Sequence, residues 1–157
     1  MSRRLARRNA FKALYSLNYL SEIDIDEFVT KTLAKDSLFW LDEKNNDNTL
    51  LDKINENDRN FYIELIKGTT DNKSNINNII KLYLKSWKMN RIAKVDLAII
   101  QLAVFEMLYK DDIPISVSIN EAVELGKEFG TDDSGGFING VLGEIAKKHS
   151  INKSKKD

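Results

Sequence analysis

Apolar residues recur along most of the chain at the three- to four-residue spacing of amphipathic helices. This pattern predicts a first helix over residues 3–20 and a second over residues 26–40, the latter capped by Asp26. Residues 42–57 are polar and contain no aromatic side chain, so they are predicted to form a loop, with room for one short turn at residues 50–54. The apolar side of the first helix is formed by Ala6, Ala10, Ala13, Leu14, Leu17 and Leu20.

Three helices are predicted to follow this loop. Asn57-Asp58 caps the first of them, and Gly68 closes it in a left-handed conformation. The second places Ile76, Ile79 and Ile80 on one side. The third, residues 92–109, is apolar on almost every side, which is typical of a helix surrounded by others, so we expect it at the centre of the fold.

The C-terminal part of the chain carries two more predicted helices after a break that contains the only proline. Ser118 and Glu121 have the spacing of a capping box, in which the two side chains reciprocally satisfy backbone N–H groups at a helix start. Gly130 is predicted to end that helix, and Asp132 or Asp133 to cap the last one.

The composition agrees with an all-α protein. One proline and seven glycines in 157 residues leave few turn signals, and 42% hydrophobic residues are enough for a substantial core. We predict a compact fold of about seven helices in two packed sub-bundles. Residues 1–148 are expected to form one domain, with sub-bundles at about 1–85 and 86–148, and residues 149–157 a polar, basic, disordered tail.

The residue types disfavour most enzyme and metal-site classes. The chain has no cysteine, which excludes disulfides, thiolate metal sites and cysteine nucleophiles. The lone His149 lies in the polar tail, and no carboxylate pair has an acid–base pattern. Glu106, within the apolar helix, is expected to have a buried basic or hydroxyl partner. We therefore expect no enzymatic activity, no cofactor and no metal. Because no apolar stretch approaches about 18 residues, we also expect no membrane association and a cytoplasmic location.

A formal net charge of zero conceals strong alternation of charge along the chain. Residues 1–21 carry five basic residues and no acid, whereas residues 96–144 carry ten acids and two bases. Four of the six arginines lie within residues 3–8. Because the planar guanidinium group suits phosphates and base edges better than an ammonium group does, this cluster is a candidate for nucleic-acid contacts.

One arc of the first predicted helix combines basic and aromatic side chains. Such a strip can bind phosphates and stack on unpaired bases. Two alternatives remain open: the aromatic residues could widen the core face while the arginines are solvated, or the strip could contact a partner protein, because Tyr and Arg are enriched at such interfaces. The arc contains Arg4, Arg7, Arg8, Phe11, Lys12, Tyr15 and Tyr19.

A glycine-containing turn precedes the last predicted helix. Residues 130–136 read Gly-Thr-Asp-Asp-Ser-Gly-Gly, and glycines at a helix N-terminus let a ligand approach unpaired N–H groups. The turn lacks the Gly-Lys-Ser/Thr ending of a nucleotide-binding loop, which disfavours an NTPase. A ligand-binding turn and an ordinary tight connection between helices both remain open.

Three segments together resemble the NusB family of transcription antitermination factors. The first, residues 3–15, reads Arg-Arg-Leu-Ala-Arg-Arg-Asn-Ala-Phe-Lys-Ala-Leu-Tyr. The second comprises Trp87 and residues 91–106, and the third comprises residues 113–130 followed by Phe-Ile-Asn-Gly-Val-Leu at residues 137–142. Their order and spacing match the family over about half of the chain.

The resemblance implies an all-helical fold of two small bundles without catalytic activity. Family members bind NusE, a small-subunit ribosomal protein, and the pair binds the boxA element of nascent RNA in the RNA polymerase antitermination complex, notably on ribosomal RNA operons. The same fold also occurs ahead of a methyltransferase domain, for which this chain has no room, so the non-enzymatic form is expected. The alternative hypothesis is a helical protein–protein interaction module, or a homodimer, without specific RNA binding.

The resemblance also implies two sets of site residues. The family's RNA surface corresponds to Arg3, Arg4, Arg7, Asp133 and Phe137. The partner surface corresponds to Tyr15, Tyr19 and Asp96. Two departures from the family are expected to weaken RNA contacts: Gly135-Gly136 replaces larger, often polar or basic residues, and Gln101 stands where an arginine is common.

Overall fold

The structure is a computed structural model that describes residues 2–20, 22–33, 55–84 and 88–148. Within these ranges every regular element is a helix, seven of them α-helices, which confirms the predicted all-α class. Most of the predicted loop and the whole of the predicted tail lie outside the described residues.

The chain divides into two compact units, residues 1–67 and residues 68–157. The sub-bundle boundary predicted from the sequence, near residue 85, falls at residues 85–87, which lie outside the described part of the chain, so that boundary stays a prediction.

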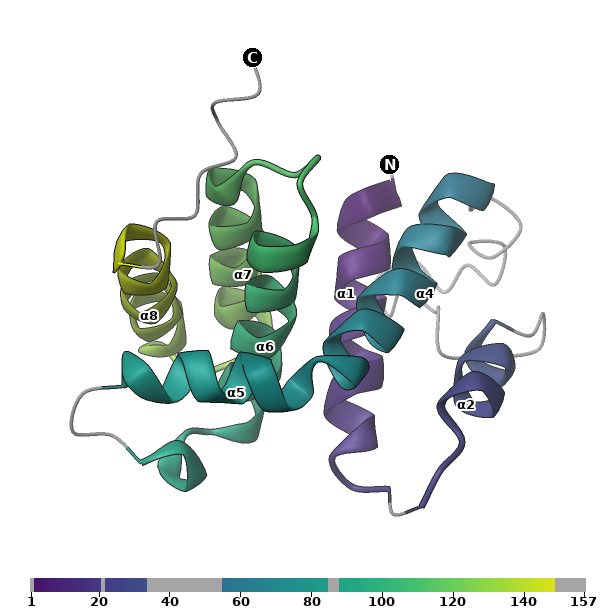
Figure 1. The fold of residues 1–157 in the computed structure, drawn as a ribbon, viewed down its shortest axis with the longest axis horizontal. Helices are drawn as coiled ribbons and strands as arrows, with labels where there is room; N and C mark the ends of the chain where they lie inside the picture. The colour runs from purple at the N-terminus through teal and green to yellow at the C-terminus, as the bar shows by residue number, and fades with distance from the viewer. Residues whose placement is uncertain (1, 21, 34–54, 85–87, 149–157) are drawn as a thin grey trace. The chain divides into compact units, whose positions relative to one another are not determined.

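The N-terminal unit contains α1 (Ser2–Leu17), α2 (Ile25–Thr32) and most of α4 (Glu56–Asp71) (Figure 1). α1 ends three residues earlier than predicted, so Leu20 lies in the following turn and is exposed instead of extending the apolar face. The core of this unit consists of Ala6, Ala10, Phe11, Ala13, Leu14, Val29, Phe61, Tyr62, Leu65 and Ile66.

The cap of α2 is Asp24. Its Oδ1 accepts the backbone N–H groups of Asp26 at 2.9 Å and Glu27 at 3.3 Å. The prediction that Asp26 caps this helix was wrong, because α2 begins at Ile25 and Asp26 already lies in its first turn. There the Asp26 carboxylate pairs with Lys67 of α4 at 2.6 Å, which ties the two helices together.

The start of α4 also differs from its prediction. Asn55 precedes the helix, and its Oδ1 accepts the N–H of Asp58 at 2.8 Å. The predicted Asn57-Asp58 cap was therefore wrong, because an asparagine two residues earlier supplies the same chemistry. The last residues of the predicted loop consequently belong to the helix.

Gly68 does not end α4, as the sequence suggested, but lies within it. The helix continues to Asp71, and no described glycine has a positive φ. A Cβ at Gly68 would overlap the ring of Phe105 in α6. The glycine is therefore needed for the close approach of an aromatic ring and not for a left-handed cap.

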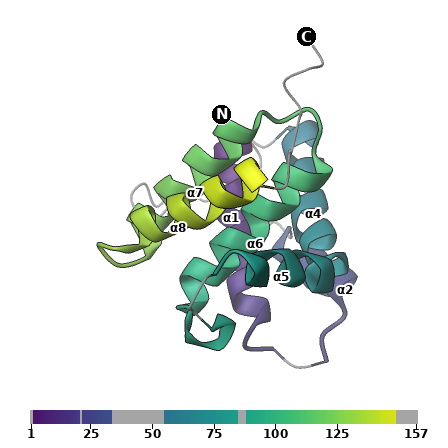
Figure 2. The ribbon, with the colours of Figure 1, turned by 60° about the vertical axis from the view of Figure 1, so that its left-hand side comes forward.

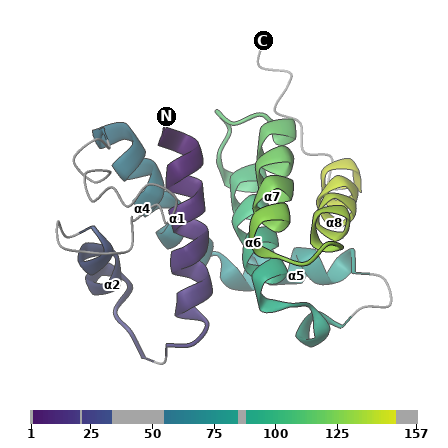
Figure 3. The same cartoon turned by 180° about the vertical axis from the view of Figure 1, so that it is seen from behind.

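The C-terminal unit is built around α6, which is buried along nearly its whole length, as predicted for the central helix. α6, α7 and α8 pack against one another, and α5 runs across α6 and α8 (Figures 1 and 3). Figure 2 shows α7 and α8 side by side, joined by a short turn. The elements are α5 (Lys73–Leu82), the 3-10 turn η2 (Met89–Arg91), α6 (Lys94–Tyr109), α7 (Ile115–Phe129) and α8 (Ser134–Lys148).

The predicted capping box of α7 was wrong. α7 begins at Ile115, directly after Pro114, so Ser118 lies inside the helix and is buried. Its hydroxyl donates to Oε1 of Glu106 in α6 at 3.3 Å. Glu106 thus has the buried hydroxyl partner that was expected for it.

Gly130 ends α7, as predicted. Its φ of −96° and ψ of −161° are extended, so the position does not depend on a left-handed conformation. A Cβ there would collide with the Ser134 side chain at the start of α8. The glycine therefore permits the tight approach of the two helix ends.

Candidate nucleic-acid interface

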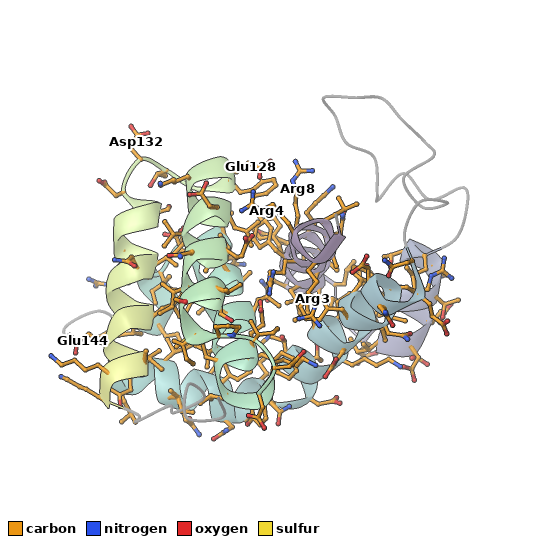
Figure 4. The ribbon with its side chains drawn as sticks, turned by 90° about the horizontal axis from the view of Figure 1, so that it is seen from above. Arg3, Arg4, Arg8, Glu128, Asp132 and Glu144 are labelled. Atoms are coloured by element: carbon orange, nitrogen blue, oxygen red, sulfur yellow. The ribbon has the colours of Figure 1, made fainter. Side chains whose placement is uncertain are left out.

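The arginine cluster lies in the first two turns of α1. Arg3 and Arg4 are exposed and Arg8 is half-buried, whereas Arg7 is only 5% exposed. Arg3 projects from a different side of α1 than Arg4 and Arg8 do (Figure 4), as expected from the rotation of about 100° per helical residue. The four guanidinium groups therefore do not form a single row.

Two of these arginines pack on an aromatic ring of α4. The guanidinium carbons of Arg3 and Arg7 lie 4.6 Å and 5.2 Å from the centroid of Phe61. Such cation–π contacts contribute about 0.5–2 kcal/mol each. Because Arg7 is buried in this contact, it helps to fix α1 on α4, and Arg3 and Arg4 are the more accessible candidates for phosphate contacts.

The aromatic residues of α1 and of the turn after it differ in burial: Tyr15 in α1 is half-buried, and Tyr19 in the turn is exposed. Phe11 is buried and so belongs to the widened core face, as one of the alternatives proposed. The Tyr15 and Tyr19 rings pack edge to face with centroids 5.3 Å apart, and their hydroxyl oxygens lie 3.1 Å apart. Tyr19 is 59% exposed, and Leu20 and Ile23 near it are also exposed. This patch has the mixed aromatic and apolar character of a protein-binding surface.

A cavity of about 370 Å³ lies in the C-terminal unit. It is bounded by η2, the first turn of α6, the α7–α8 turn and the start of α8. Three predicted site residues meet there: Asp96, Asp133 and Phe137. The full lining consists of Arg91, Ile92, Ala93, Asp96, Thr131, Asp133, Ser134 and Phe137.

The α7–α8 turn holds the cavity wall in a defined shape. The N–H of Thr131 donates to Oγ of Ser134 at 2.9 Å, and the N–H of Ser134 donates to the carbonyl oxygen of Thr131 at 3.1 Å. Asp133 immediately precedes α8, and its carbonyl oxygen accepts the N–H of Phe137 at 3.1 Å. The Asp133 carboxylate is exposed and the Phe137 ring is half-buried, so both are available at the cavity.

Asp96 brings a buried carboxylate to this cavity. It lies in the first turn of α6 and is 8% exposed. Its Oδ1 is buried and accepts no hydrogen bond within the described part of the chain. The family resemblance implies that Asp96 belongs to the partner surface, yet Asp96 lines the same cavity as Asp133 and Phe137, which the resemblance implies contact RNA.

The two departures from the family pattern have different surroundings. Gly136 is exposed, and a Cβ there would meet no atom within 4 Å, so this position offers neither charge nor bulk to a ligand. Gln101 is buried, and its Nε2 donates to Oδ1 of Asn77 in α5 at 2.8 Å. Gln101 therefore links α6 to α5.

Arg91 was not singled out from the sequence, although it lines the cavity. It is one of only two arginines outside the N-terminal cluster, and it directly precedes the central apolar helix, which is the signal that could have identified it. Among the described residues, no group of three acidic or histidine side chains is arranged to hold a metal ion.

Comparison with known proteins identifies the family. Residues 4–147 match the sequence profile of the NusB family. The chain belongs to the NusB family. The "Transcription antitermination protein NusB" of Acetivibrio thermocellus is 42% identical over 147 residues, which cover 94% of this chain and 90% of that protein.

Solved NusB structures have the same fold. The structure of T. maritima NusB superposes with a TM-score of 0.80 at 33% identity and covers 99% of this chain and 96% of that one. A crystal structure of the antitermination factors NusB and NusE in complex with dsRNA gives a TM-score of 0.71 at 22% identity, with 93% of this chain and 96% of that chain covered. The second likeness concerns the fold alone.

Within the ranges that the structure describes, no helix combines the length and the apolar character needed to span a bilayer.

Proposed function

We propose that this chain is an RNA-binding transcription antitermination factor that pairs with NusE, binds boxA RNA and supports transcription of ribosomal RNA operons. The observation that carries this proposal is the family match over residues 4–147 together with 42% identity to a protein named for transcription antitermination. A NusB of the same fold forms a complex with NusE and RNA, which supports the same pairing for this chain.

The proposed RNA surface comprises Arg3, Arg4, Arg7, Asp133 and Phe137. Its support is chemical: guanidinium groups bind phosphates, and a half-buried aromatic ring beside a polar turn can stack on an unpaired base. The exposed Arg3 and Arg4 would supply most of the phosphate contacts. Arg7 would contribute mainly by holding α1 on Phe61.

The proposed partner surface comprises Tyr15, Tyr19 and Asp96. The pair of half-buried Tyr15 and exposed Tyr19 supports it, because Tyr combines a large apolar area with a polar hydroxyl group and is enriched at protein interfaces. NusE would supply RNA contacts that this electrically neutral chain lacks.

We further propose that the chain acts in the RNA polymerase antitermination complex as an adaptor, without catalysing a reaction and without a cofactor. Because nascent RNA and a ribosomal protein are its proposed partners, its place of action would be the cytoplasm. An interaction module or homodimer that binds only proteins is the competing hypothesis, which the exposed Tyr19, Leu20 and Ile23 would also serve.

A pull-down from purified components separates these hypotheses. Tagged full-length chain is mixed with NusE, and with boxA RNA or a scrambled RNA of the same length. The proposal predicts that boxA RNA increases the recovery of NusE and is itself retained, whereas scrambled RNA is not. Recovery of NusE that is indifferent to RNA, with no RNA retained, would support the protein-only module.

A further inference from the structure

The ring of Phe61 in α4 carries two cations from α1. The guanidinium carbons of Arg3 and Arg7 lie over it, 4.6 Å and 5.2 Å from its centroid. Both distances are within the roughly 6 Å that characterises a cation–π contact. All three residues belong to the N-terminal unit. One aromatic ring of α4 therefore holds half of the arginine cluster of α1.

Helix stability alone does not explain this arrangement. Arg3 and Arg7 are four residues apart and are neighbours on one face of α1, where like charges destabilise a helix. The first turn of α1 contains no acidic residue, and the helix dipole disfavours a cation such as Arg3 at that end. An anion bound beside the two arginines would reduce both unfavourable effects.

The Phe61 ring is a fixed platform for these groups. Phe61 is 4% exposed, and the neighbouring Tyr62 and Leu65 of the same helix are fully buried in the core of the N-terminal unit. Arg3, in contrast, is exposed. The ring thus holds a guanidinium group at a place that a phosphate from solvent can reach.

Arg7 differs from Arg3 in its accessibility. It is only 5% exposed, so its contact with Phe61 fixes α1 against α4 and keeps the backbone of Arg3 in place. Its positive charge also adds to the attraction of an anion toward Arg3. Arg3 is therefore the member of the pair that would contact a ligand.

We propose that Phe61 is a positioning residue of the RNA surface, whose ring holds the Arg3 guanidinium group in place for an RNA phosphate. The inference rests on the proposed RNA-binding function and adds a residue of α4 to it. A guanidinium group has five N–H donors in its plane, and contact with one ring cannot occupy all of them, so phosphate binds while the contact with Phe61 persists. A long side chain that is fixed beforehand loses less conformational entropy on binding.

A double-mutant cycle tests this role. The affinity for fluorescent boxA RNA is measured by anisotropy with the full-length chain and NusE present. Phe61→Leu should weaken binding about threefold, and so should Arg3→Gln, because each removes the same positioned contact. Phe61→Leu combined with Arg3→Gln should then also lose only about threefold. A loss of about ninefold, the product of two independent effects, would overturn the proposal.

The same cycle with Arg4 is the matched control, because Arg4 projects from a different side of α1 than Arg3 does (Figure 4). Phe61→Leu combined with Arg4→Gln should lose about ninefold, as expected for independent effects. A loss of only about threefold in this variant would mean that Phe61 acts on α1 as a whole, which would contradict a specific role toward Arg3.

Two further variants separate the ring from its contribution to stability. Phe61→Tyr keeps an aromatic face and should bind boxA RNA like the unaltered protein. Val29→Ala truncates another core residue of the same unit, so it should lower stability in urea without changing RNA affinity. If Phe61→Tyr bound RNA as weakly as Phe61→Leu, or if Val29→Ala weakened RNA binding as much, the aromatic face would not be the cause.

NMR of the unaltered protein gives a signature that does not depend on any variant. The ring current of Phe61 should move the δ-proton signals of Arg3 upfield, and this shift should persist when NusE and boxA RNA are added. The Nε–Hε signal of Arg3 should move on addition of RNA. An Nε–Hε signal that is indifferent to RNA, or δ-proton signals that lose their upfield shift, would overturn the proposal. If Phe61→Leu does not fold by circular dichroism, this measurement decides.

Failure of this inference is distinguishable from failure of the proposed function. If the unaltered chain with NusE binds no boxA RNA, the proposed function is wrong. If that mixture binds boxA RNA and Phe61→Leu binds it equally well, only the positioning role of Phe61 is wrong.

Discussion

At the scale of single residues, the buried hydroxyl group of Tyr62 is the donor in its hydrogen bond with Thr32. The Thr32 hydroxyl lies 2.7 Å from both the carbonyl oxygen of Val29 and the Tyr62 hydroxyl oxygen. Thr32 has one hydroxyl proton, which it donates to Val29, so Tyr62 must donate to Thr32. Burial raises the pKa of Tyr62 well above its ordinary value, because the charged phenolate would be desolvated.

This raised pKa predicts a specific loss of stability in alkaline solution. Below pH of about 10 Tyr62 is neutral in both states; above it, Tyr62 ionises in the unfolded chain and stays neutral in the fold, so unfolding becomes progressively favoured. Tyr62→Phe should cost about 1 kcal/mol at pH 7, through the lost hydrogen bond, but should lose less stability between pH 9 and pH 11 than the unaltered protein. Urea unfolding at several pH values measures both effects. Tyr19→Phe, at an exposed position, is the control. If the free energy of unfolding fell equally between pH 9 and pH 11 for Tyr62→Phe and for the unaltered protein, Tyr62 would not be the group responsible for the loss.

Gly68 supports a second prediction at this scale. A methyl group there overlaps the Phe105 ring, so Gly68→Ala should lower the free energy of unfolding by about 1–3 kcal/mol. Gly140→Ala, in an exposed part of α8 with no atom near the added Cβ, should instead raise it by about 0.5–1 kcal/mol. Urea unfolding of the two variants compares them directly. If both substitutions raised the free energy of unfolding equally, the Phe105 ring would be able to move away from the added methyl group without loss of stability.

At the scale of elements, helix interiors were predictable, and so was the end of α7 at Gly130, but three helix starts were not. Residues 92–109 were identified as a central helix because their apolar residues cover every side, and that pattern depends only on the local sequence. The starts of α2 and α4 were misplaced because each has two or more capping residues within a few positions, and the start of α7 was misplaced because it follows Pro114 without a side-chain cap. Which one caps depends on tertiary contacts, such as that of Asp26 with Lys67.

The candidate site residues also divide into those that a sequence pattern identified and those that depend on tertiary contacts. Asp96, Asp133 and Phe137 were named from the family pattern, and the structure brings all three to one cavity. The burial of Arg7 on Phe61 could not be predicted, because the two residues are far apart in sequence and meet only when α1 packs on α4. Arg91 was missed because its one signal in the sequence is its place just before the central apolar helix, and that signal does not show that the α7–α8 turn lies across the same cavity.

The contact between α6 and α7 gives a prediction for the pair of helices. Ser118→Ala removes the hydroxyl donor of the buried Glu106, so it should lower the free energy of unfolding by about 1–3 kcal/mol. Ser116→Ala, an exposed position in the same helix, should change it by less than about 0.5 kcal/mol. Urea unfolding is the measurement. Equal effects of the two substitutions would mean that the Ser118 hydrogen bond contributes nothing.

At the scale of the whole molecule, the zero net charge is a sum of opposite local charges. If three or four phosphates are neutralised, the logarithm of RNA affinity should fall with the logarithm of salt concentration with a slope of roughly −2 to −3. The double variant Arg3→Ala/Arg4→Ala should make this slope less steep by about 1.4 and weaken RNA binding about tenfold. The control Lys31→Ala/Arg59→Ala makes the same change in charge elsewhere in the N-terminal unit and should change neither the slope nor the affinity. Fluorescence anisotropy at several salt concentrations measures the slopes. Identical slopes for the two double variants would mean that the arginines of α1 do not contact RNA phosphates.

The central claim is that a neutral chain binds boxA RNA as an adaptor that needs its partner. Its most direct test is a titration of fluorescent boxA RNA with the chain alone, with NusE alone and with the equimolar mixture. We predict modest binding by the chain alone, binding at least about tenfold tighter by the mixture than by either protein, and loss of this gain with scrambled RNA. The same affinity with and without NusE, or for both RNAs, would contradict the account.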